Sequence, residues 1–585
     1  MASVESLVLR PVAREQLNTA SRDSLFQIDW IPVRPSGETE VVAVRCPRTD
    51  SVREALTEVL ERLRSWLAEE RDDATRLAVV TRGAVAVGDE DGPRDLAQAA
   101  VWGLVRSAQS EHPGRFLLVD VDDPDAEPPA SDEPQLALRA GRAFAPRLTR
   151  SVPPPAEEAV LDPAGTVLIT GGSGTLAGLV ARHLVTAHGV GRVVLASRSG
   201  AIPEAASDLA AEVLGVACDV ADREAVARLL AEIPERHPLT AVVHTAGVLD
   251  DGVIESLTAD RIDRVLRPKV DGARNLHELT EHLDLAAFVL FSSGATTFGA
   301  PGQGNYAAAN AYLDALAQRR RRAGLPAVSL AWGLWAERSG LTGDLSEGDL
   351  ARMARSGSAA MATEEALALF DAALRAEPAV LVPVHLDNAT LRAQAESGTL
   401  PAILRGLVRT PIRRSAEVAG ESGFAELSEA DRERKLLALV RGHAAEVLGH
   451  DTDAAVEPDR AFKELGFDSL TAVELRNRLT AATGLRLRAT LVFDHPTPAA
   501  LAARLAGQFG GGTESDAEAV LAEIERMDDL LAAMDEDDRG RIAVRLRALL
   551  VKSGADPGGE ADAGTRLRSA TDEEMFAFID QELGS

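Results

Sequence analysis

The stretch that decides the fold is Thr166-Val167-Leu168-Ile169-Thr170, followed by Gly171-Gly172-Ser173-Gly174-Thr175-Leu176-Ala177-Gly178. The first five residues form a short apolar run typical of a buried strand, and a helical pattern follows the glycines. Glycines in such a turn let the backbone approach a pyrophosphate, which then sits at the N-terminus of the helix. Because the loop lies between a strand and a helix, the motif favours a dinucleotide-binding α/β domain.

Strand patterns continue on both sides of this loop. Downstream we predict strands over 192–196, 241–245, 287–292, 327–331 and 379–384. Upstream, residues 25 to 150 also alternate strands with helical stretches, but no glycine-rich loop follows the upstream strands, which include 41–44, 77–80 and 115–120. The run Ser151-Val152-Pro153-Pro154-Pro155 indicates a stiff linker. The sequence therefore predicts two α/β units, of which only the second binds a dinucleotide.

The strand over 192–196 is followed by Ser197 and Arg198. A site for NAD would place a carboxylate near this point to bind the ribose 2′-hydroxyl. A guanidinium instead favours a 2′-phosphate, so the pattern favours NADPH. The alternative is a surface arginine that binds no ligand.

Reduction of a ketone needs a hydride from the cofactor and a proton for the developing alkoxide. A tyrosine can donate this proton when a nearby cation lowers its pKa, and a second hydroxyl can polarise the carbonyl. Tyr306 and Ser293 fit these two roles. The chain contains two tyrosines, and the other, Tyr312, lies in an apolar helical pattern that favours a packing role.

These residues resemble the ketoreductase domains of modular type I polyketide synthases, within the short-chain dehydrogenase/reductase superfamily. The resemblance covers about 25 to 410. It implies that Lys269 and Asn310 support the proton relay behind Tyr306, and that residues 25–150 form a structural subdomain supporting the catalytic half. It also implies the following cofactor-binding residues: Gly171, Gly172, Ser173, Gly174, Thr175, Leu176, Ser197, Arg198, Asp219, Val220, Ala246 and Gly247.

The segment Leu249-Asp250-Asp251 resembles the fingerprint of B-type ketoreductases, which make the D-configured 3-hydroxyl. Phe298 stands where A-type enzymes carry a tryptophan, and Ala308 stands where epimerising B-type domains carry a proline. The resemblance therefore implies a non-epimerising B-type domain. The alternative for Asp250 and Asp251 is a solvated turn after a strand.

Two further segments resemble parts of the substrate groove of these ketoreductases. Leu341-Thr342-Gly343-Asp344-Leu345 and the helical stretch 349–361 resemble a mobile lid. Trp332 precedes them, and core packing explains this tryptophan at least as well as substrate contact does.

A helical domain is predicted over 431–510. Gly466-Phe467-Asp468-Ser469-Leu470 lies between two helical patterns, and the segment 492–498 follows. This arrangement resembles the acyl carrier proteins of the same synthases and implies 4′-phosphopantetheine on Ser469. The alternative is that Asp468 or Ser469 only caps a helix, and both can hold together. The resemblance also implies a carrier-bound 3-ketoacyl chain as the substrate, and a flexible arm would raise its local concentration at the ketoreductase.

The tail over 511–585 shows three amphipathic patterns. The first has a seam with alternating spacings of four and three residues, which predicts a coiled coil. A second helix and a terminal helix that begins at Thr571 follow. The apolar positions of the three patterns are Val520, Ile524, Met527, Leu531 and Met534; Ile542, Leu546, Leu549 and Leu550; Met575, Phe578, Ile579 and Leu583. The tail resembles a C-terminal docking domain, which implies a homodimer and a downstream synthase polypeptide as partner. The alternative is a disordered acidic tail.

Composition excludes several function classes. The formal net charge is -29, which argues against nucleic acid as a partner. Cys46 and Cys218 are the only cysteines, so we expect no disulfide framework and no metal site, and we predict a reducing bacterial cytoplasm as the location. No signal peptide or apolar run of membrane length is present in the sequence, so we expect no membrane.

The segment Val4 to Pro11 resembles the closing strand of a dehydratase domain. Residues 1–24 are therefore expected to be the remnant of a dehydratase, with a ketosynthase and an acyltransferase further upstream in the same module.

Together the sequence predicts an α/β fold with two Rossmann-like subdomains, structural (25–150) and catalytic (151–410). A linker (411–430), an all-α carrier bundle (431–510) and a helical docking tail (511–585) follow. The predicted reaction is NADPH-dependent reduction of a carrier-tethered 3-ketoacyl thioester to a D-3-hydroxyacyl thioester. Two alternatives are a carrier and docking scaffold with a silent reductase, and a free-standing dehydrogenase, which would leave Ser469 and the tail unexplained.

Overall fold

The computed structural model describes residues 23–510, except 38, 70–74, 89–91, 153, 155–159, 338–339, 341–342, 344–352, 356, 409–423, 425–426, 451, 486 and 489. The chain divides into two units, Met1–Phe509 and Gly510–Ser585. The predictions for the dehydratase remnant, for half of the lid residues, for the linker up to 423 and for the docking tail concern residues outside this description. They stay predictions.

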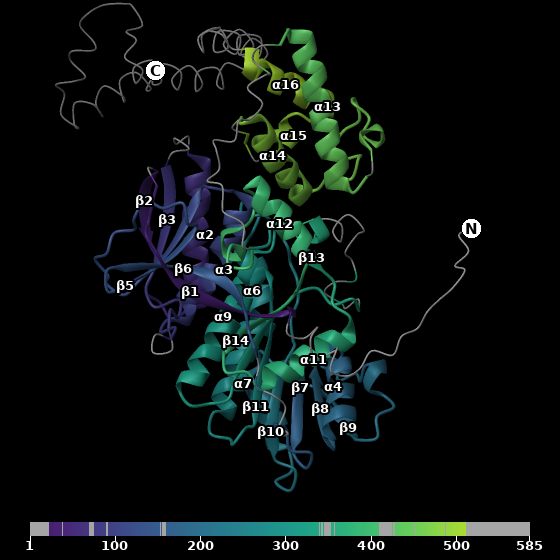
Figure 1. The fold of residues 1–585 in the computed structure, drawn as a ribbon. Helices are drawn as coiled ribbons and strands as arrows, with labels where there is room; N and C mark the ends of the chain where they lie inside the picture. The colour runs from purple at the N-terminus through teal and green to yellow at the C-terminus, as the bar shows by residue number, and fades with distance from the viewer. Residues whose placement is uncertain are drawn as a thin grey trace, which may run out of the picture. The chain divides into compact units, whose positions relative to one another are not determined.

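One sheet of 13 strands runs through both α/β halves, in the order β2-β3-β4-β5-β6-β1-β14-β12-β11-β10-β7-β8-β9 (Figure 1). The first half contributes β1 (Leu25–Val33), β2 (Glu40–Arg45), β3 (Thr75–Thr81), β4 (Phe116–Val121), β5 (Gln135–Arg139) and β6 (Arg142–Arg150). The second contributes β7 (Thr166–Thr170), β8 (Arg192–Ser197), β9 (Glu212–Ala217), β10 (Leu239–His244), β11 (Ala287–Ser293), β12 (Val328–Trp332) and β14 (Val380–Pro383).

The two predicted Rossmann-like subdomains are joined edge to edge. β1 pairs antiparallel with β6 over its whole length and with β14 where Leu25 is opposite Pro383. The α/β prediction is confirmed, and the continuous sheet is a feature that the sequence did not indicate, because the paired strands lie far apart in the chain.

The central strands of the second half are buried along almost their whole length. All five residues of β7 are buried, and β7 pairs in parallel with β8 and β10. A continuous apolar run is typical of a parallel strand covered on both faces, which is why the sequence located these strands. β9 is the edge strand, and its exposed and half-buried residues gave a weaker pattern.

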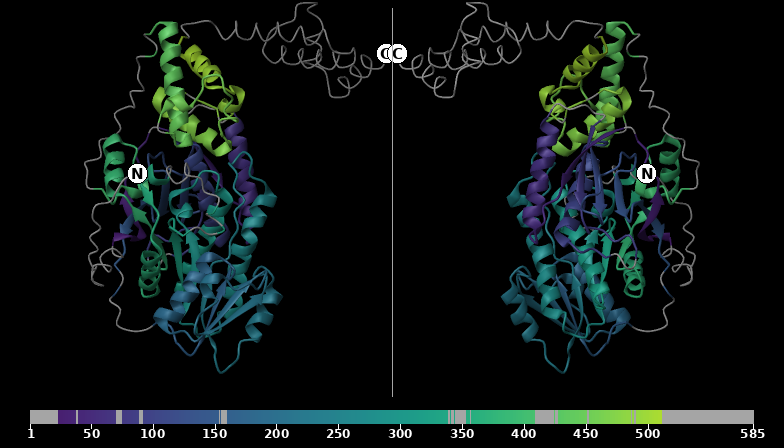
Figure 2. Two further views of the ribbon diagram at one scale, coloured as in Figure 1. Left: turned by 90° about the vertical axis from the view of Figure 1, so that its right-hand side faces the viewer. Right: turned by 90° about the vertical axis from the view of Figure 1, so that its left-hand side faces the viewer.

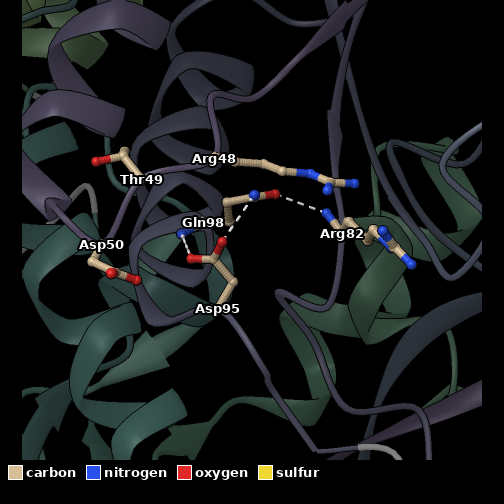
Figure 3. A pocket seen from close by; sticks show the side chains of 6 residues that line it. All are labelled: Arg48, Thr49, Asp50, Arg82, Asp95 and Gln98. Atoms are coloured by element: carbon tan, nitrogen blue, oxygen red, sulfur yellow. Dashed lines mark hydrogen bonds between the residues drawn. The ribbon is translucent and has the colours of Figure 1, made fainter.

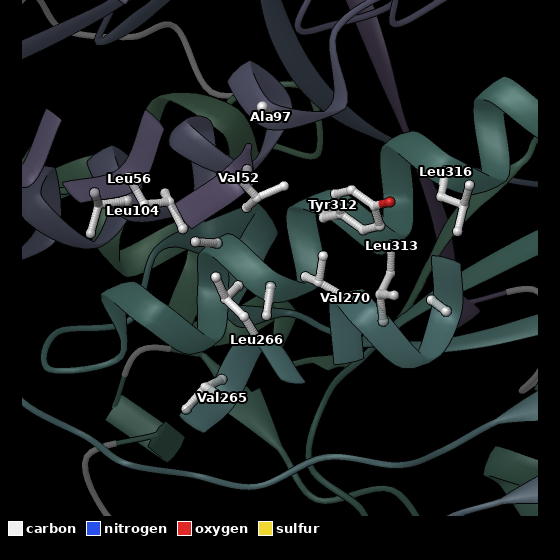
Figure 4. Close-up of a cluster of buried hydrophobic side chains, with 14 of the residues drawn as sticks. Val52, Leu56, Ala97, Leu104, Val265, Leu266, Val270, Tyr312, Leu313 and Leu316 are labelled. Carbon is white, nitrogen blue, oxygen red and sulfur yellow. The ribbon is translucent and has the colours of Figure 1, made fainter. Parts of the chain in front are cut away.

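Helices from both halves share one hydrophobic core. α2 (Val52–Ala68) and α3 (Leu96–Glu111) of the first half pack against α6 (Ala259–Leu266), the π-helical turn η2 (Arg267–Asp271) and α9 (Gly304–Arg322) of the second. Figure 4 shows Leu56, Leu104 and Leu266 in this cluster. Tyr312 is 5% exposed and lies in the same cluster, as its apolar pattern predicted. The first half therefore supports the helix that carries Tyr306.

The remaining elements complete the ketoreductase-like part of the fold. They are α4 (Thr175–His188), η1 (Glu204–Ala206), α5 (Arg223–Ala231), α7 (Gly272–Thr280), α8 (Ala295–Phe298), β13 (Ser358–Ala359), α11 (Thr363–Leu374), β15 (His385–Leu386), α12 (Asn388–Ser397) and η3 (Ala402–Leu404). β13 and β15 form a separate two-stranded sheet.

The first half has a small polar pocket beside the carboxyl ends of β2 and β3. Its volume is about 270 Å³, and Figure 3 shows Asp95 and Gln98 from the start of α3 beside Arg48 and Arg82. The Gln98 amide donates to Asp95 and accepts from the Arg82 backbone N–H, at 2.9 and 2.8 Å. Charged and polar side chains therefore line this pocket, and the supporting role of this half stays a prediction.

The carrier-like region is a helical bundle (Figure 2). It contains α13 (Glu429–Leu448), η4 (Asp453–Ala455), α14 (Ser469–Thr483), α15 (Leu491–Asp494) and α16 (Pro498–Gly510). Its buried core draws on each long helix, through Leu436, Val440, Leu475, Leu479, Leu501 and Leu505. Among the described helices of the chain, none combines the length and the apolar character that a membrane span requires.

Candidate active site

The glycine loop after β7 has the backbone geometry that a pyrophosphate requires. Gly171 has φ +70°, and a Cβ at this position would lie 2.8 Å from the Ala246 backbone nitrogen. A Cβ on Gly172 would lie 2.7 Å from the Leu195 backbone. Gly174 is the N-cap of α4 and provides no side-chain cap. The first N–H groups of α4 can therefore bind a phosphate, which fits the predicted dinucleotide site.

The residues predicted to bind the other end of the dinucleotide lie after β8 and β9. Ser197 is buried and its Oγ accepts a hydrogen bond from the Gly200 N–H at 3.0 Å, which shapes the turn. Arg198 is exposed, and its side chain forms no hydrogen bond or ion pair with another described residue. Asp219 accepts from the Ala221 N–H at 3.0 Å, and Val220 is buried beside it. Because β7, β8 and β9 are neighbours and parallel, these residues lie at the same edge of the sheet as the glycine loop.

The four predicted catalytic residues come together at the carboxyl end of β11. Ser293 ends this strand, and Tyr306 and Asn310 lie one turn apart on α9. The Lys269 ammonium, on η2, lies 5.2 Å from the centre of the Tyr306 ring and donates to the Phe291 carbonyl at 2.9 Å. The Asn310 amide nitrogen donates to the Tyr306 carbonyl at 2.9 Å. The structure thus places a phenol, a second hydroxyl and a cation in one site.

Burial controls the protonation of this site. It raises the pKa of Tyr306, and hydrogen bonding by the Asn310 and Ser293 side chains opposes the rise. Burial also lowers the pKa of Lys269 to about 7, while the negative charge of Asp314 opposes that shift. A lysine with this pKa exchanges its proton near neutral pH, which suits a proton relay.

Two groups near Lys269, Asp314 and His244, were not assigned a role beside this lysine from the sequence. The Asp314 carboxylate, on α9, accepts from Ser329 Oγ at 2.6 Å, and burial raises the pKa of Asp314 to about 6. The His244 ring contacts Thr170 Oγ1 at 2.7 Å and the Lys269 carbonyl oxygen at 3.2 Å. Burial and the Lys269 charge lower the pKa of His244 to about 3, so this ring is neutral and positions the lysine backbone. Only the helical spacing of Asp314 from Tyr306 could have pointed to it.

Ion pairs and a hydrogen bond hold the Leu249-Asp250-Asp251 loop beside Tyr306. Asp250 forms ion pairs with Arg261 at 2.9 Å and with Arg264 at 2.7 Å. The Gln303 amide donates to Asp251 at 2.9 Å, and burial raises the pKa of Asp251. The alternative of a solvated turn therefore does not describe Asp250, whereas Asp251 is exposed.

Trp332 belongs to the core. It is 6% exposed, and its ring centre lies 5.0 Å from that of Trp335 and 5.5 Å from that of Phe291. The packing alternative for this tryptophan is favoured over substrate contact.

Ser469 is the first residue of α14 and is exposed. Asp468 before it is the N-cap, and its side chain accepts from the Thr471 N–H at 2.8 Å. The capping function therefore falls to Asp468, and the Ser469 hydroxyl stays accessible for a covalent group.

Three family models match separate parts of the chain. The KR domain matches residues 165–337, and the phosphopantetheine attachment site matches residues 438–505. The Rossmann fold domain of the polyketide synthase extender module SpnB matches residues 10–148.

A solved structure described as that of A-type ketoreductases from a modular polyketide synthase is 33% identical to this chain, with a TM-score of 0.55. The match covers 98% of that structure and 66% of this chain. The chain belongs to the modular polyketide synthases. Its ketoreductase domain is also similar to PlmKR1, the ketoreductase of the first phoslactomycin module in Streptomyces sp. HK803, at 30% identity with a TM-score of 0.57 over 99% of that structure and 66% of this chain.

Curated polyketide synthases match the chain over all or most of its length. GfsA of Streptomyces halstedii is 47% identical over 100% of this chain, and NorA′ of the spectinabilin system of Streptomyces orinoci is 56% identical over 77%. The chain spans 9% of the length of GfsA and 13% of that of NorA′. The chain thus holds a ketoreductase domain and a phosphopantetheine attachment domain of a modular polyketide synthase, and the relatives are much longer.

Proposed function

We propose that this polyketide synthase chain reduces a 3-ketoacyl thioester, carried on 4′-phosphopantetheine at Ser469, to the 3-hydroxyacyl thioester with NADPH. The observation that carries the proposal is the convergence of Tyr306, Ser293 and Lys269 beside a dinucleotide loop, in a chain that also contains an exposed carrier serine. A tethered substrate explains why both domains occur in one polypeptide.

Each residue has a separate role in the proposed reduction. The cofactor, when bound, supplies the hydride to the carbonyl carbon. Ser293 donates a hydrogen bond to the carbonyl oxygen, and Tyr306 gives its phenolic proton to the oxygen as the alkoxide forms. The charge of Lys269 favours the phenolate that remains. Asn310 has a buried Oδ1 that lacks a hydrogen-bond partner among the described residues, so it can accept a hydrogen bond from a water that returns the proton.

Arg198 supports NADPH as the cofactor. Its guanidinium is exposed after β8, at the edge of the sheet that carries the glycine loop, and is available for a 2′-phosphate. The requirement for NADPH and the two free, buried cysteines also support the proposal that the protein works in a reducing bacterial cytoplasm.

The Leu249-Asp250-Asp251 loop supports a D-configured product without epimerisation. Its ion pairs and its bond to Gln303 hold it beside the catalytic tyrosine, where it can limit how the acyl chain enters. Phe298 and Ala308 agree with this B-type assignment. Chiral analysis of the product from a 2-methyl-3-ketoacyl thioester tests it, and an L-hydroxyl product would contradict it.

We propose the partners that the sequence pattern implies. Upstream these are the ketosynthase, acyltransferase and dehydratase of the same module, and downstream the next synthase polypeptide. The tail over 511–585 would form a homodimer and bind that polypeptide. A truncation after Gly512 that remained equally dimeric would contradict the dimer role.

The decisive experiment uses the whole chain. Phosphopantetheinyl transferase and coenzyme A load the carrier, a 3-ketoacyl group is attached, and NADPH is added. We expect a mass gain of one phosphopantetheine that is absent in Ser469→Ala, followed by gain of two hydrogens on the acyl group. Tyr306→Phe should slow the reduction roughly 10²–10⁴-fold, the usual contribution of a positioned acid. The alternative scaffold with a silent reductase predicts loading without any reduction.

A further inference from the structure

Helix α14 of the carrier has two faces with different partners. Ala472, Leu475 and Leu479 lie in the carrier core. Leu470, Val473 and Asn477 follow one another at helical spacing on the opposite side. Val473 is only 4% exposed although it points away from the core residues. A second surface therefore covers this face of α14.

The second surface is the C-terminal end of α3 in the ketoreductase. Arg476 Nη2 donates to the Glu111 carbonyl oxygen at 2.9 Å, and the Asn477 amide donates to the same oxygen at 3.2 Å. Glu111 is the last residue of α3, so its carbonyl has no partner within the helix. Arg476 also lies 3.5 Å from the His112 ring nitrogen Nδ1.

The charge of Arg476 matches this position. The carbonyl end of a helix is negative and favours a cation, and the last turn of α3 has no basic residue of its own. Arg476 is 8% exposed, and a buried guanidinium is costly unless it is paired. The negative charges of Glu255 and Glu111 oppose the lowering of the Arg476 pKa by burial. The carrier thus supplies the cation that α3 lacks.

The contact lies next to the catalytic loops. A Cβ built on Gly302, four residues before Tyr306, would lie 3.5 Å from Leu470 Cδ1. The Glu111 carboxylate accepts from the Gly302 N–H and from the Ile254 N–H, each at 2.8 Å. Gly252 directly follows Asp251, and its N–H donates to the Gly302 carbonyl at 2.7 Å. One buried glutamate therefore joins the carrier contact to both loops that flank the catalytic tyrosine.

We propose that Ser110–His112 and Gly302 form a docking site for helix α14 of the carrier of the same chain, and that Arg476 anchors the carrier there. Leu470 rests on the Gly302 turn, so the neighbouring Ser469 and its arm lie at the approach to Tyr306. This inference rests on the proposed function, since it assumes that the arm at Ser469 presents the ketone.

The test compares a tethered with a diffusible substrate in the whole chain. The tethered substrate is a 3-ketoacyl group on loaded Ser469, and the diffusible one is the N-acetylcysteamine thioester of the same acid. Arg476→Ala should slow tethered reduction roughly tenfold or more, as truncation of a buried charge at an interface usually does. Reduction of the diffusible thioester should not change. Arg504→Ala, an exposed arginine on α16, is the matched control and should change neither rate.

Further measurements separate the possible failures. A wild-type rate of phosphopantetheine loading shows that the Arg476→Ala carrier is folded, and Asn477→Ala provides a milder second variant. An unchanged tethered rate in both folded variants, or a parallel fall for both substrates, would overturn the docking site. If the wild-type chain reduces neither substrate, the proposed function fails instead. A rate of tethered reduction per chain that rises with protein concentration would show that the carrier of a second chain occupies the site. That result would overturn the placement within one chain.

Discussion

Gly103 on α3 and Ala307 on α9 are in backbone contact: a Cβ at Gly103 would lie 2.1 Å from the Ala307 carbonyl oxygen. Only glycine permits this approach, because a real Cβ cannot come so close to a backbone atom. Ala307 directly follows Tyr306. The packing of a helix from the first half therefore sets the position of Tyr306, the proposed proton donor, in the second.

Replacing Gly103 with alanine should push α9 away from its place. We expect Gly103→Ala to lower the free energy of unfolding by roughly 1–3 kcal/mol, the usual cost of overpacking, and to lower the reduction rate as well. Chemical denaturation and NADPH oxidation measure the two effects. Gly88→Ala is the matched control, since nothing lies within 4 Å of a Cβ at Gly88. Equal stability and activity in Gly103→Ala and Gly88→Ala would contradict the role of this contact.

The buried ammonium of Lys269 should lower the free energy of unfolding. Burial lowers its pKa from 10.5 to about 7, so the folded chain binds this proton less tightly than the unfolded chain does. The cost is therefore complete below pH 7 and fades as the pH rises toward 10.5. The change in the free energy of unfolding caused by Lys269→Met should therefore be more favourable at about pH 6 than at about pH 9, in the protein without cofactor.

The same substitution should lower the rate of reduction, because the phenolate of Tyr306 loses the neighbouring cation. Denaturation at the two pH values and NADPH oxidation give the two readouts. Lys463→Met, at an exposed lysine of the carrier, should change neither. A loss of stability in Lys269→Met that grows at low pH would show that the ammonium favours the folded state.

We expect Arg198 to cause a preference for NADPH over NADH. We expect Arg198→Ala to raise the KM for NADPH by roughly 10- to 100-fold, since hydrogen bonds to charged groups contribute about 1.5–3 kcal/mol. The KM for NADH should change little, because NADH has no 2′-phosphate. Arg236→Ala removes an exposed arginine in the turn between α5 and β10 and serves as the control. Equal changes for both cofactors would place Arg198 outside the phosphate site.

The sequence predicted what depends on local pattern. The apolar run 166–170 with its glycines located the dinucleotide loop, and the resemblance supplied Lys269 and Asn310, which the structure brings beside Tyr306. Pairing between strands that are distant in the chain leaves no such local pattern in the sequence. Leu25 pairs with Pro383, so the joining of the two halves depends on residues that are hundreds of positions apart.

Buried charges were missed for a related reason. Asp314 and Glu111 lie within helical patterns, where an acidic residue usually faces solvent. Burial raises the pKa of Asp314 to about 6 and the pKa of Glu111 to about 7. Their roles depend on hydrogen-bond donors such as Ser329 and Gly302, which only the fold brings near.

We expect Asn305 to control the stereochemistry of the product without taking part in hydride transfer. It is fully buried, and its amide donates to the Asp250 carbonyl at 2.8 Å and to the Arg261 carbonyl at 3.2 Å. Its Oδ1 accepts from the Tyr306 N–H at 2.8 Å. One side chain thus ties the Asp250 loop to the catalytic helix.

Asn305→Ala should leave these backbone groups without partners, at a cost of roughly 1–3 kcal/mol in stability. The loop would then move relative to Tyr306, so the product should contain more of the minor 3-hydroxy enantiomer while hydride transfer continues. Chiral chromatography of the product gives this ratio. Gln303→Ala, which removes only the bond to the Asp251 carboxylate, should shift the ratio less. If Asn305→Ala lost activity but kept a single enantiomer, Asn305 would support the tyrosine alone, and the loop would be held by Arg261 and Arg264.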